Sequence, residues 1–195
     1  MIVPPPGVHR NRAPVGLVPG DSGDTSTNIA TQTVASHQQA GVNAIIGAAS
    51  SDVTKTVIDT VTQAGILMFS PANTSDSFTT YADNGLYFRT APPDLFQGQV
   101  LADLITKEGN QSVGILAQNG EYGTGLAQVI ADNLANAVRG EAVVKQEYYD
   151  PNASDFSDVV QKMVDLTPDA IVVIGVDESG KIIQNMNEQG IGPAR

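Results

Sequence analysis

Polar and aromatic side chains follow four apolar runs of the sequence, and their types are suited to holding a small ligand. In chain order they are Ser50 and Ser51 after the run 43–47, Thr74 after 66–70, Tyr122 after 112–116, and Asp177 after 169–175. Hydroxyl groups can donate hydrogen bonds to a carboxylate, and an acidic side chain can accept them from an ammonium group. The set therefore favours a site for a small polar molecule that carries a carboxylate and an ammonium group.

Each of these residues also has a purely structural explanation. A serine before a helix commonly caps it, so Ser50 or Ser51 could serve only the predicted helix 52–64. Tyr122 could pack at the start of a helix, and Asp177 could complement a helix dipole. Both interpretations stay open for each residue alone, and their common placement after strand ends favours the binding interpretation.

The sequence contains no complete set of catalytic residues. The segment 20–24 (GDSGD) resembles the serine surroundings of trypsin-like proteases, but the only histidines are His9 and His37. His9 lies in a Pro-rich arm, and His37 is expected near the end of a helix, at the edge of its packed face. There is no G-x-S-x-G, P-loop or G-x-G-x-x-G motif. We therefore predict that the chain is not an enzyme, with an unrecognised α/β enzyme as the disfavoured alternative.

A metal or cofactor site is not expected. The chain has no cysteine and two histidines, which makes a centre of several soft or imidazole ligands improbable. The segment 150–155 (DPNASD) resembles the start of a calcium loop, but it lacks the glycine at the sixth position and the glutamate at the twelfth.

The amino-acid composition limits the classes of molecule that the chain can bind. The 195 residues are 41% hydrophobic and 16% charged, with a formal net charge of -11. Such an acidic chain argues against nucleic acid and anionic membrane surfaces as partners. No apolar run approaches the roughly 18 residues of a membrane-spanning helix, and the N-terminal segment has no apolar stretch typical of a signal peptide.

Apolar strands alternate with amphipathic helices along most of the chain. The predicted strands are 15–19, 43–47, 66–70, 86–90, 112–116, 141–149 and 169–175. Glycines where left-handed helix ends are expected are Gly41, Gly65, Gly109, Gly140 and Gly190. Apolar rows at helical spacing include Val53, Val57 and Val61 in one helix and Phe96, Val100 and Leu104 in another. Short, continuously apolar strands between helices predict an α/β fold with parallel sheets covered on both faces.

The Pro-Pro pair after Ala91 is the best candidate boundary between two lobes, 1–91 and 92–195. The strand at 15–19 has no helix before it, and the strand expected after Gly190 is missing. We therefore expect an α/β protein cut at both ends, the first lobe without its opening strand–helix unit and the second without its later strands. The alternative is a small complete fold with ragged termini.

Four blocks in order carry a family resemblance: IIGAASSDVTKTVIDTVTQAGILMFSPANTS, LYFRTAPPDLFQGQVLADLI, VGILAQNGEYGTGLAQVI and DFSDVVQKMVDLTPDAIVV. Over about residues 15–192 the chain resembles the extracytoplasmic branched-chain amino acid binding proteins of ABC importers, which have the type I periplasmic binding fold. The resemblance implies two hinged α/β lobes that close on an amino acid or a similar small polar ligand without catalysis, a permease as partner of the full-length protein, and a periplasmic or cell-surface location.

The same resemblance assigns ligand-binding residues to both lobes. Those of the first lobe are Ser50, Ser51, Ala72, Asn73 and Thr74, and those of the second are Tyr122, Val176 and Asp177. Asp177, Glu178 and Glu121 are the acidic residues considered for a ligand's ammonium. A ligand-sensing regulatory domain of the same fold is the alternative function.

Overall fold

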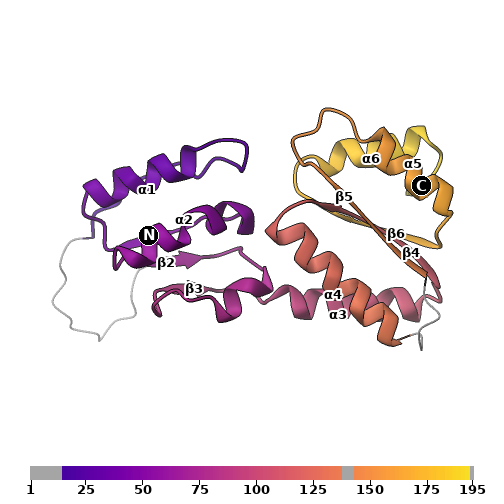
Figure 1. The fold of residues 1–195 in the computed structure, drawn as a ribbon, viewed down its shortest axis with the longest axis horizontal. Helices are drawn as coiled ribbons and strands as arrows, with labels where there is room; N and C mark the ends of the chain where they lie inside the picture. The colour runs from indigo at the N-terminus through magenta and orange to yellow at the C-terminus, as the bar shows by residue number, and fades with distance from the viewer. Residues whose placement is uncertain (1–14, 138–142, 194–195) are drawn as a thin grey trace, which may run out of the picture.

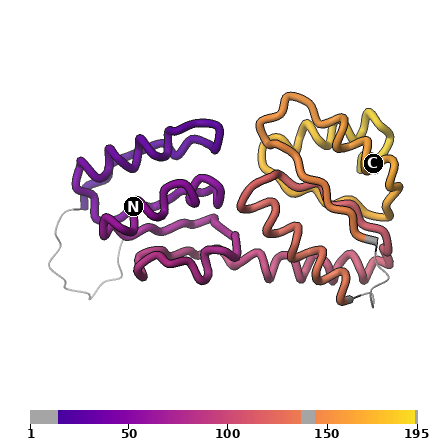
Figure 2. The backbone as a smooth tube through the Cα atoms, viewed as in Figure 1, coloured from indigo at the N-terminus to yellow at the C-terminus, as the bar shows by residue number. Residues whose placement is uncertain are grey.

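Two lobes connected at helix α3 make up the computed structural model, which describes residues 15–137 and 143–193 (Figure 1). The first lobe comprises α1 (Ile29–Gln39), β1 (Ala44–Ile46), α2 (Ser51–Gln63), β2 (Leu67–Ser70), the short 3-10 helix η1 (Asp76–Thr80) and β3 (Tyr87–Arg89). The second comprises α3 (Asp94–Lys107), β4 (Ser112–Gln118), α4 (Glu121–Ala137), β5 (Val143–Tyr149), α5 (Ser157–Leu166), β6 (Ala170–Ile174) and α6 (Ser179–Glu188). The backbone trace passes between the lobes at the start of α3 (Figure 2).

The first lobe has a parallel three-stranded sheet in the order β1-β2-β3. Ile45, Met68 and Tyr87 lie in register on one face, where they pack with the apolar sides of α1 and α2. Because side chains alternate along a strand, the next residues in register point the other way. There Ile46 is 79% exposed and Phe88 49% exposed, so no described helix covers this face.

Helix α2 begins where the sequence predicts. The hydroxyl of Ser50 accepts a hydrogen bond from the Val53 N–H at 3.3 Å, which satisfies one of the free donors of the first turn. Val57 and Val61 are buried one turn apart, as the periodic pattern predicts. Left-handed glycines are confirmed after four helices, with φ of 69° at Gly41, 73° at Gly65, 85° at Gly109 and 79° at Gly190. Gly140 lies outside the described residues.

The second lobe encloses its sheet on both faces. The strand order is β5-β4-β6, all parallel, and β4 is buried from Val113 to Gln118. Val113, Ile115 and Ala117 pack with α3 and α4, whereas Leu116 packs with α5 and α6. A strand buried on both faces explains why 113–117 is continuously apolar rather than alternating.

The apolar row Phe96, Val100 and Leu104 of α3 does not face the core. These side chains are 57%, 67% and 50% exposed. Helix α3 instead packs on α4 through Gly98 and Ala102, and a Cβ at Gly98 would meet the Val129 side chain. Small residues let the two helix backbones approach closely, so the face with the smaller side chains is the buried one.

The strand predicted at 15–19 is wrong. These residues form no ladder, and Val15 and Leu17 are 87% and 89% exposed. An apolar run becomes a strand only when a neighbouring backbone accepts its hydrogen bonds, and β1 pairs only with β2 in the described part of the chain.

In residues 15–137 and 143–193, no helix is long and apolar enough to cross a membrane.

Candidate functional site

The loops that follow four strands meet in one cavity of about 220 Å³ between the lobes. The first lobe contributes Ala49, Ser50, Ser51, Asp52, Ala72 and Thr74, and the second contributes Gln97, Gln118, Tyr122, Gly175 and Val176. In parallel sheets the carboxyl ends of neighbouring strands share an edge, and here those edges face each other. The structure therefore brings together six of the eight residues predicted for the site.

The two serines differ in how they are engaged. Ser50 is exposed at the cavity while its hydroxyl caps α2. Ser51 is 4% exposed, and its hydroxyl accepts a hydrogen bond from the Ser75 N–H at 3.4 Å. The capping role considered for these serines is confirmed for Ser50 alone, since the Ser51 hydroxyl instead bonds the loop after β2. A hydroxyl that accepts one bond can still donate another, so neither contact removes its capacity to bind a carboxylate.

Asn73 does not line the cavity. Its side chain is completely buried and donates to the carbonyls of Ala48 at 3.2 Å and Ala49 at 2.8 Å. Its amide oxygen accepts the hydroxyl of Tyr87 at 2.8 Å. With its amide bonded on three sides, Asn73 ties the loop after β2 to the loop after β1, which holds Ala72 and Thr74 at the cavity wall.

A buried carboxyl group lies behind this wall. Asp94, the first residue of α3, is completely buried, and its N–H donates to the Thr74 carbonyl at 2.8 Å. Neither carboxyl oxygen has a hydrogen-bond partner among the described residues. Burial raises the pKa of Asp94 to about 6, against smaller opposing effects of the Thr74 hydroxyl and the Arg89 guanidinium.

Tyr122 forms part of the opposite wall. Burial, and then the negative charge of Asp94, raises the pKa of the Tyr122 hydroxyl above its usual value. The phenol therefore stays protonated and can donate a hydrogen bond to a bound molecule.

The three acidic candidates are not equivalent. The Glu178 carboxylate is buried and accepts hydrogen bonds from the Tyr149 hydroxyl at 3.0 Å and the Val176 N–H at 3.2 Å. Glu121 accepts the Ser75 hydroxyl at 3.0 Å. Asp177 is exposed and lines an adjoining cavity of about 380 Å³, which Val176 also lines. Asp177 is thus the acidic candidate whose carboxylate remains most open to a ligand.

Two glutamines of the cavity were missed from the sequence. Gln118 is the last residue of β4, and Gln97 lies in the first turn of α3. Gln118 had a usable signal, because it ends a predicted strand on the side where ligands bind. Gln97 had none, since its position depends on how α3 crosses between the lobes.

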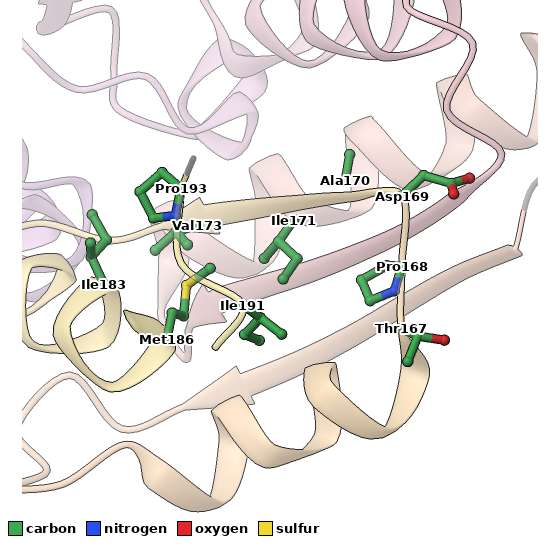
Figure 3. A pocket seen from close by; sticks show the side chains of 10 residues that line it. All are labelled: Thr167, Pro168, Asp169, Ala170, Ile171, Val173, Ile183, Met186, Ile191 and Pro193. Atoms are coloured by element: carbon green, nitrogen blue, oxygen red, sulfur yellow. The ribbon is translucent and has the colours of Figure 1, made fainter. Parts of the chain in front are cut away.

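A larger groove lies elsewhere, along the free edge of β6 (Figure 3). It measures about 600 Å³ and is lined mainly by apolar side chains such as Ile171, Ile183 and Met186. The carboxylate of Asp169, at one end of the groove, accepts the N–H groups of Gln111 and Ser112 at 2.9 Å. The groove therefore offers apolar surface without converging polar groups, unlike the cavity between the lobes.

No group of three or more His, Cys, Asp or Glu side chains in residues 15–137 and 143–193 is arranged to hold a metal ion. The groups that converge on the cavity are hydroxyls, amides, one phenol and the carboxylate of Asp52. This donor set suits hydrogen bonding to a small polar organic molecule.

The family model described as "Periplasmic binding protein" matches residues 7–195. The chain is 29% identical over 153 residues to the Leu/Ile/Val-binding protein of Citrobacter freundii, a match that covers 77% of this chain and 41% of that protein. It is also 25% identical over 135 residues to human metabotropic glutamate receptor 8, with 68% of this chain and 15% of the receptor covered.

The chain is also similar to a solved structure of a binding protein. The branched-chain amino acid transporter substrate binding protein LivJ of Streptococcus pneumoniae, in complex with isoleucine, superposes with a TM-score of 0.68 at 28% identity. The match covers 84% of this chain and 46% of that one. The chain therefore spans less than half the length of these binding proteins.

Proposed function

Because the chain belongs to the periplasmic binding protein family, we propose that it binds an amino acid between two hinged lobes, residues 1–91 and 92–195, on behalf of an ABC importer. The proposed place of action is outside the cytoplasm, where such a protein passes its ligand to a permease. The relatives named as Leu/Ile/Val-binding proteins support the ligand class. No turnover is proposed, because the cavity brings together groups that bind rather than groups that react.

The observation that carries the proposal is a cavity whose walls come from both lobes. Residues far apart in sequence, Ser50, Thr74, Tyr122 and Val176, line the same space of about 220 Å³. A ligand that touches both lobes stabilises the arrangement in which they are close, and this differential affinity drives closure.

The proposed contacts follow from the chemistry of each wall. Ser50, Ser51 and the N–H groups at the start of α2 donate to the ligand's carboxylate, helped by the positive end of the helix dipole. Ala72 and Thr74 contribute main-chain and hydroxyl groups for the carboxylate and the ammonium. Asp177 at the adjoining cavity accepts the ammonium from the second lobe.

Titration calorimetry of the purified chain with the twenty amino acids tests the proposal. We expect binding of an aliphatic amino acid, and a loss of roughly tenfold or more in affinity for Thr74→Ala, since a charge-assisted hydrogen bond is worth about 1.5–3 kcal/mol. Lys107→Ala, at the exposed end of α3, is the control and leaves affinity unchanged. Equal affinities for the two variants would remove Thr74 from the site.

A sensory role is the second candidate, favoured by the similarity to a glutamate receptor. Both roles share the same site, so ligand binding alone does not separate them. Genes for a permease and an ATPase beside the gene for this chain favour transport, whereas a continuous reading frame into a signalling domain favours sensing.

A further inference from the structure

Five hydrogen bonds join the lobes among the described residues, and two of them lie at the start of α3, where the chain itself crosses. The other three cross the cleft to the end of β4 and the start of α4. The Glu121 N–H donates to Oδ1 of Asp52, and the Gln118 side-chain amide donates to Oδ2 of the same carboxylate at 3.3 Å. In the third, the Ser75 hydroxyl donates to the Glu121 carboxylate at 3.0 Å. Asp52 and Ser75 belong to the first lobe, whereas Gln118 and Glu121 belong to the second.

The Asp52 carboxylate stands where a helix cap is needed. The first N–H groups of a helix have no partner within it, and its dipole places partial positive charge at this end. The residue before α4 is Gly120, which has no side chain to act as a cap. A residue of the opposite lobe therefore supplies the acceptor that α4 lacks.

The close approach depends on this glycine. A Cβ at Gly120 would collide with the Asp52 carboxylate. By contrast, a Cβ at Gly125, one turn further along α4, would meet nothing within 4 Å. The two glycines form a matched pair, one directly before α4 and one within it, because only the first borders the contact between the lobes.

The contact is continuous with the cavity. Asp52 and Gln118 both line it, and Tyr122 follows Glu121 directly in α4. When Asp52 holds the Glu121 N–H, it fixes the distance of Tyr122 from Ser51 and Thr74 across the cavity. The carboxylate is then committed to α4 and is not the partner of a ligand's ammonium.

We propose that Asp52 is the positioning residue of lobe closure: by capping α4 across the cleft it sets the fraction of molecules whose two walls are in place to bind. The proposal rests on the proposed function, since it assigns regulation of the same site. The apparent dissociation constant of a ligand equals the intrinsic one divided by the binding-competent fraction. Loss of the cap therefore weakens binding without any loss of a direct ligand contact.

The first test needs no ligand. Small-angle X-ray scattering compares the wild-type chain with Asp52→Ala, Asp52→Asn and Gly120→Ala. We expect a larger radius of gyration for Asp52→Ala and Gly120→Ala, and an intermediate value for Asp52→Asn, whose amide oxygen still accepts one hydrogen bond. The controls Asp158→Asn, a first-turn aspartate of α5, and Gly125→Ala leave the radius unchanged.

An unchanged radius of gyration in both Asp52→Ala and Gly120→Ala would overturn the proposal. So would equal expansion in the two controls, because a general loosening of helices would then account for it. Circular dichroism of each variant verifies that the helices are retained. If Asp52→Ala fails to fold, Asp52→Asn and Gly120→Ala decide the outcome.

The second test uses L-leucine as the probe. We expect Asp52→Ala to bind it roughly fivefold more weakly, the effect of losing one helix cap, mainly through faster dissociation. If the wild-type chain binds no amino acid, the proposed function fails. The scattering result then still tests whether Asp52 holds the two lobes together. If wild type and Asp52→Ala bind L-leucine equally, the role in binding is refuted although the function stands.

Discussion

The two lobes are built from the same strand–helix unit but bury their sheets differently. In the second lobe, β4 lies between β5 and β6 with helices on both faces, and Ile115 and Leu116 are completely buried on opposite sides. In the first lobe, Met68 is covered by α1 and α2, whereas Ile46 and Phe88 remain exposed on the other face.

Equal sequence patterns in the two lobes therefore do not imply equal contributions to stability. An apolar strand residue contributes to stability in proportion to the area that other elements remove from water. The open face of the first sheet therefore contributes little to the folding of the described residues and remains available for contact with other apolar surface.

The largest effect is expected in the second lobe. Ile115→Ala removes a side chain that is completely buried, so the free energy of unfolding should fall by about 2–5 kcal/mol. The same substitution at Ile46, which is 79% exposed, should cost less than about 1 kcal/mol. Urea unfolding followed by circular dichroism measures both, and similar losses at the two positions would contradict the contrast.

A second effect concerns association through the open face. Replacing Ile46 and Phe88 together with threonine should raise the concentration at which copies associate by about tenfold or more, since burying one large apolar side chain is worth roughly 1.5–3 kcal/mol. Sedimentation velocity over a range of concentrations measures this shift. Val100→Thr on the exposed row of α3 is the comparison, and an equal effect there would mean that the open face has no special role.

The smallest effect concerns the junction of the lobes, at Asp94. Its pKa of about 6, raised from 3.8 by burial, means that the folded chain holds a proton that the unfolded chain releases. Stability from this group is therefore lost as pH rises from about 4 to 6. Asp94→Asn should match the wild type near pH 4 and exceed it by on the order of 1 kcal/mol at pH 7.

Thermal and urea unfolding at a series of pH values checks this prediction. Asp158→Asn, the same substitution at an exposed position, is the control. A stability difference between Asp94→Asn and wild type that stays constant across pH would show that the carboxyl group is not held protonated by the fold.

Local patterns were enough to locate most elements. The strands predicted at 43–47, 66–70, 86–90, 112–116 and 169–175 are confirmed, and the signal for them was an apolar run bounded by turn residues. The helix ends at Gly65 and Gly109 are confirmed as well, and their signal was glycine, which adopts φ above zero without a steric penalty. The run at 15–19 had the same composition as these strands, and nothing in the sequence indicated that it lacks a partner in the described structure.

The residues of the candidate site were also predicted only in part. The rule that ligands bind beyond the carboxyl ends of parallel strands was sufficient to select Ser50, Thr74 and Tyr122, which line one cavity. The family resemblance added Asn73, whose side chain instead ties two loops together inside the first lobe. Adjacent residues in a loop point in different directions, so spacing alone does not decide which of them faces a ligand.

By itself, the sequence determined the α/β class, the order of strands and helices, and the loops that could hold a ligand, because these depend on residue periodicity and on turn chemistry within a few residues. Only the tertiary structure decided which face of α3 is buried, that the first sheet has an open face, and that Asp52 caps a helix of the other lobe. These features depend on the approach of segments far apart in the sequence, such as Gly98 and Val129 or Asp52 and Glu121. Such contacts leave no mark on local sequence patterns.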